Sequence, residues 1–140
     1  MRSKTLWTSN VLSTVYSAWL IWAFGGAVIR AGGADYIEAL GASFKFAFQM
    51  LGLSSPAVNF LYAAVILLFL HIIAFVLGCL IGWISYAGKK SGGAKFAATL
   101  YLIGTICFPI FFIFGLPITI VGFIGGGKQK KLNSVEPVIG

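Results

Sequence analysis

Residues 65–82 read VILLFLHIIAFVLGCLIG, a run without a charged side chain that holds one histidine and two glycines spaced four apart. The uncharged stretch around this run extends over residues 57–87. An α-helix rises 1.5 Å per residue, so a bilayer core of about 30 Å needs roughly 20 apolar residues. Because the stretch is longer than this, we predict one long transmembrane helix over residues 57–87 that tilts or protrudes.

The composition of the whole chain indicates the same environment. Of its 140 residues, 59% are hydrophobic and 9% are charged, whereas an ordinary soluble domain carries about 25% charged residues. The polar side chains are too few to make the exterior of a soluble fold. We therefore predict an all-α integral membrane protein in which residues 1–140 form a single small membrane domain.

Another transmembrane helix is predicted over residues 11–29, a length just sufficient to span a bilayer. The first half of this helix is polar for a membrane segment, and Ser13 and Ser17 lie on one helical face. Hydroxyl groups within membranes usually face another helix rather than lipid. We therefore expect the face of Ser13 and Ser17 to pack against a neighbouring helix.

Residues 36–51 have the pattern of an amphipathic helix. Glu38, Lys45 and Gln49 share one side, and the opposite side is apolar. The length and mixed polarity favour a helix that lies in the membrane interface. Packing of this helix against the rest of the protein is the other interpretation of the same pattern.

The third apolar segment, residues 96–127, is compatible with two topologies. Its glycines and prolines fit a single kinked span, or a re-entrant helical hairpin that turns between Pro109 and Pro117. Two arms of about 14 residues are too short for both to cross a bilayer, which favours the single span. The hairpin, in contrast, places every basic cluster on one side of the membrane. Residues 132–140 are predicted to be a short polar tail.

The basic residues stand at the ends of the apolar runs, and the net charge is +7. This placement predicts contacts with anionic lipid headgroups and, by the positive-inside rule, an N-terminus and basic loops on the cytoplasmic side. No basic surface with interleaved aromatic residues is present, so nucleic acid is not an expected partner. The lysines expected to contact lipid are Lys89, Lys90, Lys95, Lys128, Lys130 and Lys131.

Small residues recur every four positions on the predicted helices. Ala74, Gly78 and Gly82 form one such ladder, and Gly122 and Gly126 form another. In lipid, small residues allow helix backbones to approach closely, and this packing drives helix association. Since a chain of this size has few helices of its own, we expect the ladders to bind partners, either copies of the chain or larger membrane subunits.

His71 is predicted to lie near the bilayer midplane, where an imidazole needs a partner. One interpretation is a neutral ring that is hydrogen-bonded to Tyr16, Ser17 or Thr105 on a neighbouring helix. The others are ligation of haem or a metal, and proton transfer. Proton relays usually include an acidic group, and no Asp or Glu lies in any apolar run. An interhelical hydrogen bond is therefore the favoured role, and no cofactor is expected.

The run LFLHIIAFVLGCLIGWISY, followed by another apolar segment, resembles the small haem-anchor subunits of succinate dehydrogenase. The resemblance implies haem or quinone binding through His71. The chain departs from that pattern after the histidine, because the Asp-Tyr pair of such subunits is missing and Tyr86 follows Ser85.

No catalytic constellation is present, because the only aspartate, Asp35, lies in a predicted loop and no paired carboxylates or metal-ligand spacing occur. We expect no enzymatic activity from the chain itself. The favoured function is a structural or accessory subunit of a larger membrane complex. The alternatives are a self-assembling holin-, pilin- or channel-like protein and the haem- or quinone-binding anchor.

Overall fold

The structure is a computed structural model that describes residues 1–30 and 55–139, together with isolated positions between these ranges. The regular structure in these ranges is helical throughout and forms four helical arms. The amphipathic helix predicted over residues 36–51 lies outside the described residues, single positions excepted.

The first arm consists of α1 (Lys4–Leu20), the π-helical turn η1 (Ile21–Gly25) and α2 (Gly26–Arg30). It begins before residue 11, the predicted start, because the hydroxyl of Ser3 caps the helix by accepting a hydrogen bond from the Leu6 amide at 3.3 Å. The chain remains helical through η1, where the wider turn is followed directly by α2.

The second arm is α4 (Ser55–Ala87), whose 33 residues correspond to about 50 Å of helix. It leads through a tight turn into α5 (Ser91–Cys107), which runs back along α4. In this turn the amide of Lys90 donates to the Ser85 carbonyl at 2.8 Å, and Lys89 adopts a left-handed backbone with φ of 53°.

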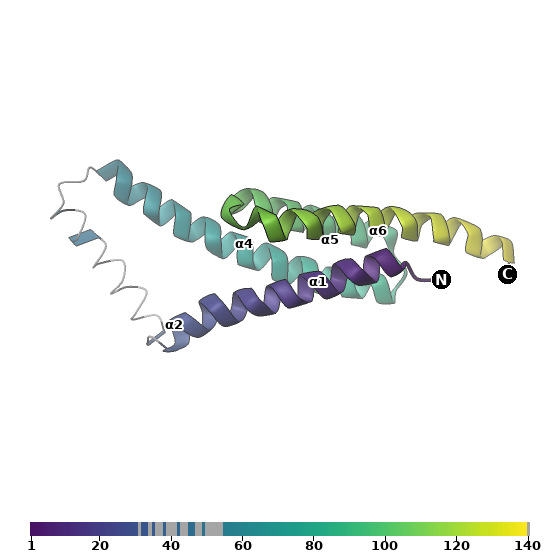
Figure 1. The fold of residues 1–140 in the computed structure, drawn as a ribbon, viewed down its shortest axis with the longest axis horizontal. Helices are drawn as coiled ribbons and strands as arrows, with labels where there is room; N and C mark the ends of the chain where they lie inside the picture. The colour runs from purple at the N-terminus through teal and green to yellow at the C-terminus, as the bar shows by residue number, and fades with distance from the viewer. Residues whose placement is uncertain are drawn as a thin grey trace.

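The segment 96–127 forms a helical hairpin and is not a single kinked helix. Phe108 leaves the helical conformation at the end of α5, and Pro109 opens the 3-10 turn η2 (Pro109–Phe111). The chain then reverses into α6 (Phe112–Ile139), which packs antiparallel to α5 (Figure 1). α6 stays helical through residues 132–139, the predicted tail.

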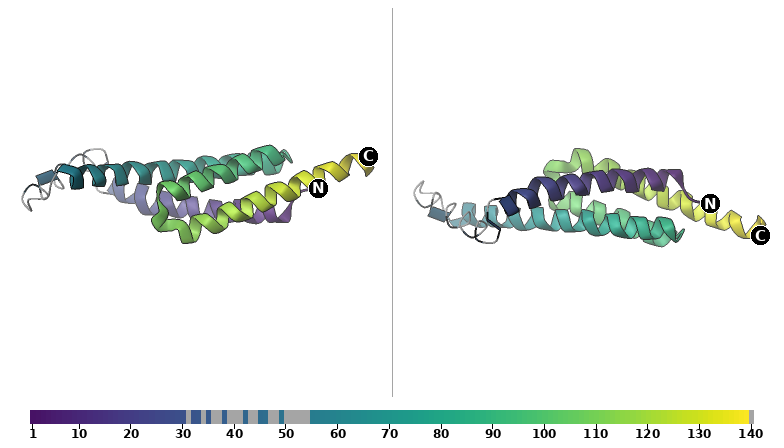
Figure 2. Two further views of the ribbon diagram at one scale, coloured as in Figure 1. Left: turned by 90° about the horizontal axis from the view of Figure 1, so that it is seen from above. Right: turned by 90° about the horizontal axis from the view of Figure 1, so that it is seen from below.

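The four arms form a closed bundle in which each helix packs on two neighbours, in the circular order α1, α4, α5, α6. Both chain termini and the α4–α5 turn lie at one end of the bundle (Figures 1 and 2). All three basic clusters therefore gather at this end, which we call the basic end. At the other end, α4 extends well past the α5–α6 turn (Figure 2).

The interior combines an apolar cluster around Leu20, Phe75 and Tyr101 with many buried polar side chains, and the exterior is largely apolar. Large apolar side chains are exposed along α4 and α6, among them Leu80, Ile84 and Ile113. Two helical segments of the described chain, Ala63–Ala87 and Pro109–Val135, are long and apolar enough to cross a membrane. The 17-residue α1 is shorter and carries a polar face. The buried polar residues are Ser3, Ser9, Asn10, Ser13, Ser17, His71, Ser85, Thr105, Thr119 and Gln129.

Candidate functional site

His71 lies in the middle of the bundle, is fully buried, and binds two other arms through its ring nitrogens. Its Nε2 is 2.8 Å from the hydroxyl of Tyr16 on α1. Its Nδ1 is 2.7 Å from the carbonyl oxygen of Gly104 on α5. The ring thus joins α1, α4 and α5 at one point.

The two hydrogen-bond partners determine which tautomer a neutral His71 adopts. A carbonyl oxygen only accepts, so Nδ1 carries the hydrogen and donates to Gly104. Nε2 then has a lone pair and accepts from the Tyr16 hydroxyl. Gly104 lies in the last turn of α5. The Gly104 carbonyl also accepts from the Phe108 amide at 3.2 Å, so His71 helps to close the end of α5 beside the hairpin turn.

Aromatic rings surround this bonded group. The ring centroid of His71 is 4.9 Å from that of Phe75, and 6.1 Å and 5.9 Å from those of Phe108 and Phe111 in the turn. Tyr16 packs edge-on against Phe75, with centroids 4.8 Å apart. These contacts exclude water and hold the turn against the His71–Tyr16 pair, so this cluster fixes the position of the hairpin.

The same two hydrogen bonds make His71 a poor ligand for haem iron. In the neutral ring one nitrogen carries a hydrogen and the lone pair of the other accepts from Tyr16. Coordination through Nε2 would require the tyrosine hydroxyl to move away. Within the described part of the chain, no group of three His, Cys, Asp or Glu side chains is placed to hold a metal ion.

A second polar group joins α1 to α4 and α5 nearer the basic end. The amide nitrogen of Asn10 donates to the Gly82 carbonyl at 3.0 Å. The hydroxyl of Tyr101 donates to Ser13 Oγ at 2.9 Å, and Ser13 Oγ donates to the Asn10 carbonyl at 2.9 Å. Ser17 is also buried, and within the described part of the chain its hydroxyl has no hydrogen-bond partner. The polar face of α1 is therefore turned into the bundle.

The ladder on α4 faces α5 and α1 of the same chain. A Cβ atom on Gly78 would lie 2.6 Å from the ring of Tyr101, and one on Gly82 would lie 2.6 Å from the side-chain oxygen of Asn10. Ala74 is buried beside Gly104. These close approaches leave no room for larger side chains.

The ladder on α6 is also enclosed within the chain. A Cβ atom on Gly122 would lie 3.1 Å from Ala98, and one on Gly126 would lie 3.4 Å from the Lys95 backbone nitrogen. Beside this ladder, a Cβ atom on Gly125 would lie 2.7 Å from the Leu6 backbone. Since both ladders pack within one chain, they no longer argue for partners in trans.

At the basic end, polar side chains fasten the N-terminus to α6. The fully buried Gln129 accepts from the Ser3 amide at 2.9 Å and donates to the Met1 carbonyl at 3.1 Å. Asn133 donates to the Lys89 carbonyl at 2.7 Å. The six lysines expected to contact lipid all belong to segments at this end: Lys89, Lys90, Lys95, Lys128, Lys130 and Lys131.

Sequence reasoning singled out His71 and the small residues but missed several of their partners. Tyr101, Asn10 and Gln129 were not expected to carry interhelical contacts. A signal was available for Asn10 and Gln129, because a polar amide beside an apolar run in a membrane protein needs a buried partner. No local signal marks the Gly104 carbonyl, since every residue has one.

Comparison of the chain with protein-family models, with curated proteins and with solved structures finds no match. The fold and the site therefore define the class: an all-helical bundle with a buried polar interior, two helices long and apolar enough to cross a membrane, and a helical hairpin held by His71.

Proposed function

We propose that the protein is an integral membrane protein without catalytic activity of its own, which serves as a structural or accessory subunit of a larger membrane complex. The observation that carries the proposal is a bundle that exposes large apolar side chains, buries many polar ones and gathers its basic clusters at one end. Hydrocarbon surroundings favour this distribution, because polar groups there must bond within the protein and apolar side chains can face lipid.

In the proposed topology, α1–α2 and α4 cross the bilayer, and the α5–α6 hairpin enters from the basic end and turns back within the bilayer. The close approach of Gly126 to Lys95 puts both residues at one depth. From Gly126 to Phe112 the helix rises about 21 Å, less than the roughly 30 Å of a hydrocarbon core. Although α6 is long and apolar enough to cross a membrane, this depth favours a re-entrant hairpin.

A broken helix at membrane depth needs cover from protein. Phe108 and Phe111 pack against His71, and the amide of Phe111 donates to the Phe108 carbonyl at 3.4 Å. This cover supports a hairpin that ends within the bilayer. The positive-inside rule then assigns the basic end, including the N-terminus, to the cytoplasmic side.

The part of α4 that extends past the hairpin supports a role in a complex. Most of its described large side chains there are exposed, including Phe60, Ile66 and Phe69. A partner helix, lipid, or both can cover this surface. The other candidate functions have less support: Tyr101, Phe75 and His71 fill the interior where a pore would run, and both nitrogens of His71 are hydrogen-bonded.

Topology is tested by labelling single cysteines at positions 91 and 134 in a variant whose natural cysteines, Cys79 and Cys107, are replaced by alanine. In sealed membrane vesicles, an impermeant maleimide should label both positions from the same side. Labelling from opposite sides would overturn the re-entrant hairpin, because a single crossing separates these positions.

The subunit role is tested by native mass spectrometry of the protein extracted in mild detergent. One or two copies associated with defined other chains is the expected result. A large assembly of identical copies would favour the self-assembling alternative instead, and a monomer alone would contradict both. A haem Soret band that vanishes in His71→Ala would favour the anchor function.

A further inference from the structure

We propose that the seam between α1 and α6 binds one anionic phospholipid, with the headgroup at the basic end and an acyl chain in an apolar groove nearer the midplane. This inference rests on the membrane location in the proposed function. It goes beyond that function by assigning one ligand to one surface. Two pockets on the same pair of helices carry it.

The headgroup pocket has a volume of about 480 Å³ and lies where the N-terminus meets the last turns of α6. Among the described side chains, no carboxylate is paired with any of its four basic residues. The ammonium of Lys128 is held at the seam by a 3.1 Å hydrogen bond to the Thr5 hydroxyl. Basic pockets between membrane helices suit anionic headgroups. Its basic residues are Arg2, Lys4, Lys128 and Lys131.

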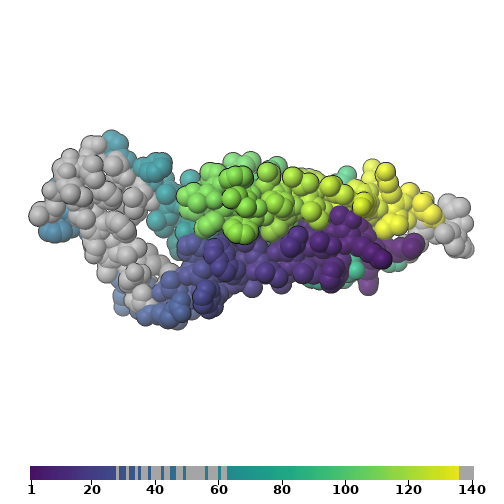
Figure 3. Space-filling model, in the orientation of Figure 1, coloured from purple at the N-terminus to yellow at the C-terminus, as the bar shows by residue number. Residues whose placement is uncertain are grey.

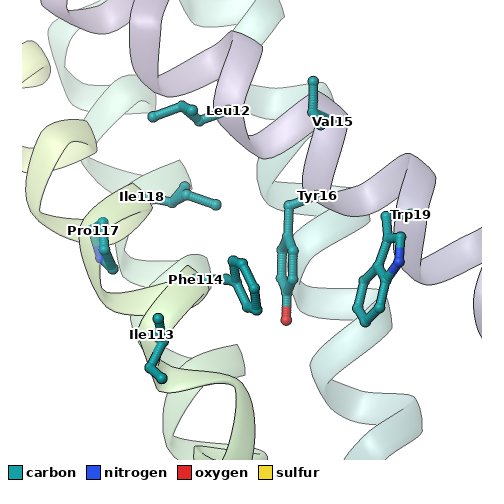
Figure 4. Close-up of a pocket in the computed structure, with 8 residues that line it drawn as sticks. All are labelled: Leu12, Val15, Tyr16, Trp19, Ile113, Phe114, Pro117 and Ile118. Atoms are coloured by element: carbon teal, nitrogen blue, oxygen red, sulfur yellow. The ribbon is translucent and has the colours of Figure 1, made fainter.

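The apolar groove has a volume of about 520 Å³ and lies between the middle of α1 and the start of α6 (Figure 4). Tyr16 and Phe114 stack in it with ring centroids 5.8 Å apart, and Trp19 lies beside them. The Tyr16 hydroxyl is bonded to His71. The groove therefore presents mainly carbon atoms to a ligand. Its lining residues are Leu12, Val15, Tyr16, Trp19, Ile113, Phe114, Pro117 and Ile118.

One surface connects the two pockets, because α1 and α6 lie side by side on the face shown in Figure 3. Helical spacing places Thr8 between the α1 residues of the two pockets, and Ile124 between those of α6. Both side chains are exposed. The Thr8 hydroxyl is bonded to the Lys4 carbonyl at 3.1 Å, so this stretch presents mainly carbon atoms.

The separation of the pockets fits one lipid leaflet. From Lys4 to Val15 the helix rises about 17 Å, and half of a bilayer core measures about 15 Å. The Arg2 guanidinium is already bonded to the Ala87 carbonyl at 3.3 Å. A lipid with its phosphate at Lys4, Lys128 and Lys131 can therefore place a chain end in the groove. Charge complementarity at one end and carbon lining at the other select an anionic phospholipid over a free phosphate or a neutral lipid.

The test measures lipid retained by the full chain in detergent, by native mass spectrometry, with equal amounts of phosphatidylglycerol and phosphatidylcholine carrying the same acyl chains. The expected result is one phosphatidylglycerol per chain in clear excess over phosphatidylcholine. The variant K4Q/K128Q/K131Q should lose this preference by about 100-fold, since one cation near a headgroup contributes about fivefold.

The matched control K90Q/K95Q/K130Q removes three exposed lysines at the same end that do not line the pocket. It should change the preference by less than about fivefold. Equal losses in the two triple variants would overturn the site, because a general basic surface would then account for the binding.

The groove is tested separately with Val15→Phe, which adds bulk at a side chain that is 64% exposed, and with Val65→Phe on α4 as its control. Val15→Phe should reduce retention of phosphatidylglycerol about tenfold, and the control should not. Unchanged retention in Val15→Phe would overturn the acyl-chain half of the proposal. Displacement of the lipid by glycerol 3-phosphate alone would show a phosphate site in its place.

These outcomes are independent of the subunit test. A chain that is found alone by mass spectrometry can still retain phosphatidylglycerol, which would contradict the proposed function and leave the lipid site standing. A chain in a defined complex that retains both lipids equally would contradict only the lipid site.

Discussion

The two halves of α4 have similar apolar sequences but opposite surroundings. None of the described side chains at residues 63–70 is buried. Between residues 71 and 87, seven residues are buried against α1, α5 and α6. These seven recur at steps of three and four and include few large apolar residues: His71, Ala74, Phe75, Gly78, Cys79, Gly82 and Ser85.

This difference shows that the content of apolar residues does not decide which half of α4 packs against the other helices. Hydrocarbon offers apolar side chains as good an environment as a neighbouring helix does. Small residues that allow close approach, and polar groups that need partners, decide which half is covered. Variants that change a small residue or a polar group in the packed half should therefore lose more stability than variants in the uncovered half.

The largest effect is expected for Gly78→Leu in the packed half. Its side chain would overlap the ring of Tyr101 and approach the Ala97 carbonyl, so that α4 and α5 must separate. We expect a loss of about 3 kcal/mol in the free energy of unfolding, measured by unfolding in mixed micelles of mild detergent and dodecyl sulfate.

Ala63→Leu is the control for this change, since Ala63 is exposed on the other half of the same helix. Its free energy of unfolding should stay within about 0.5 kcal/mol of the unchanged protein. Similar losses of unfolding free energy in Gly78→Leu and Ala63→Leu would show that the two halves of α4 do not differ in packing.

The next largest effect is expected for His71→Leu, which leaves the Tyr16 hydroxyl and one interaction of the Gly104 carbonyl without a partner. We expect a loss of about 2 kcal/mol. Tyr16→Phe should cost about 1 kcal/mol, since only one hydrogen bond is removed.

The double variant His71→Leu/Tyr16→Phe sharpens this result. Its loss should be smaller than the sum of the single losses by about 0.6 kcal/mol, the typical coupling of a hydrogen bond in a membrane protein. Strict additivity would mean that the two side chains do not interact.

A smaller loss, about 1 kcal/mol, is expected for Asn10→Ala. The change removes the hydrogen bond to the Gly82 carbonyl, while the small alanine keeps α1 and α4 close. The free energy of unfolding of this variant is measured in the same mixed micelles. An unchanged stability would show that the polar face of α1 contributes packing alone.

The smallest effect is expected for Leu70→Ala, one residue before His71. This leucine is 47% exposed on the uncovered half. In detergent or lipid, Leu70→Ala should lower the free energy of unfolding by less than about 0.5 kcal/mol, because acyl or detergent chains fill the space of the lost methyl groups. A loss of 2 kcal/mol or more would indicate that this half packs against another chain, which would be seen as a change in assembly size.

Much of the helical arrangement could be predicted from local sequence. The apolar run 57–87 lies within the 33 residues of α4, and the buried Ser13 and Ser17 are the hydroxyls expected to face another helix. The start of α1 was placed too late, because Ser3 provides a helix cap before the apolar run begins. The hairpin could not be chosen over a kinked span, since Pro109 is compatible with both.

The sequence by itself determined the all-helical class, the long apolar runs and the faces that pack closely, because composition and the 3.6-residue period are local properties. Only the tertiary structure decided that segment 96–127 turns back, that His71 binds Tyr16 and Gly104, and that both small-residue ladders close within one chain. A ladder specifies a close neighbour without specifying which helix supplies it. The antiparallel hairpin supplies those neighbours from the same chain and brings all the basic clusters to one end.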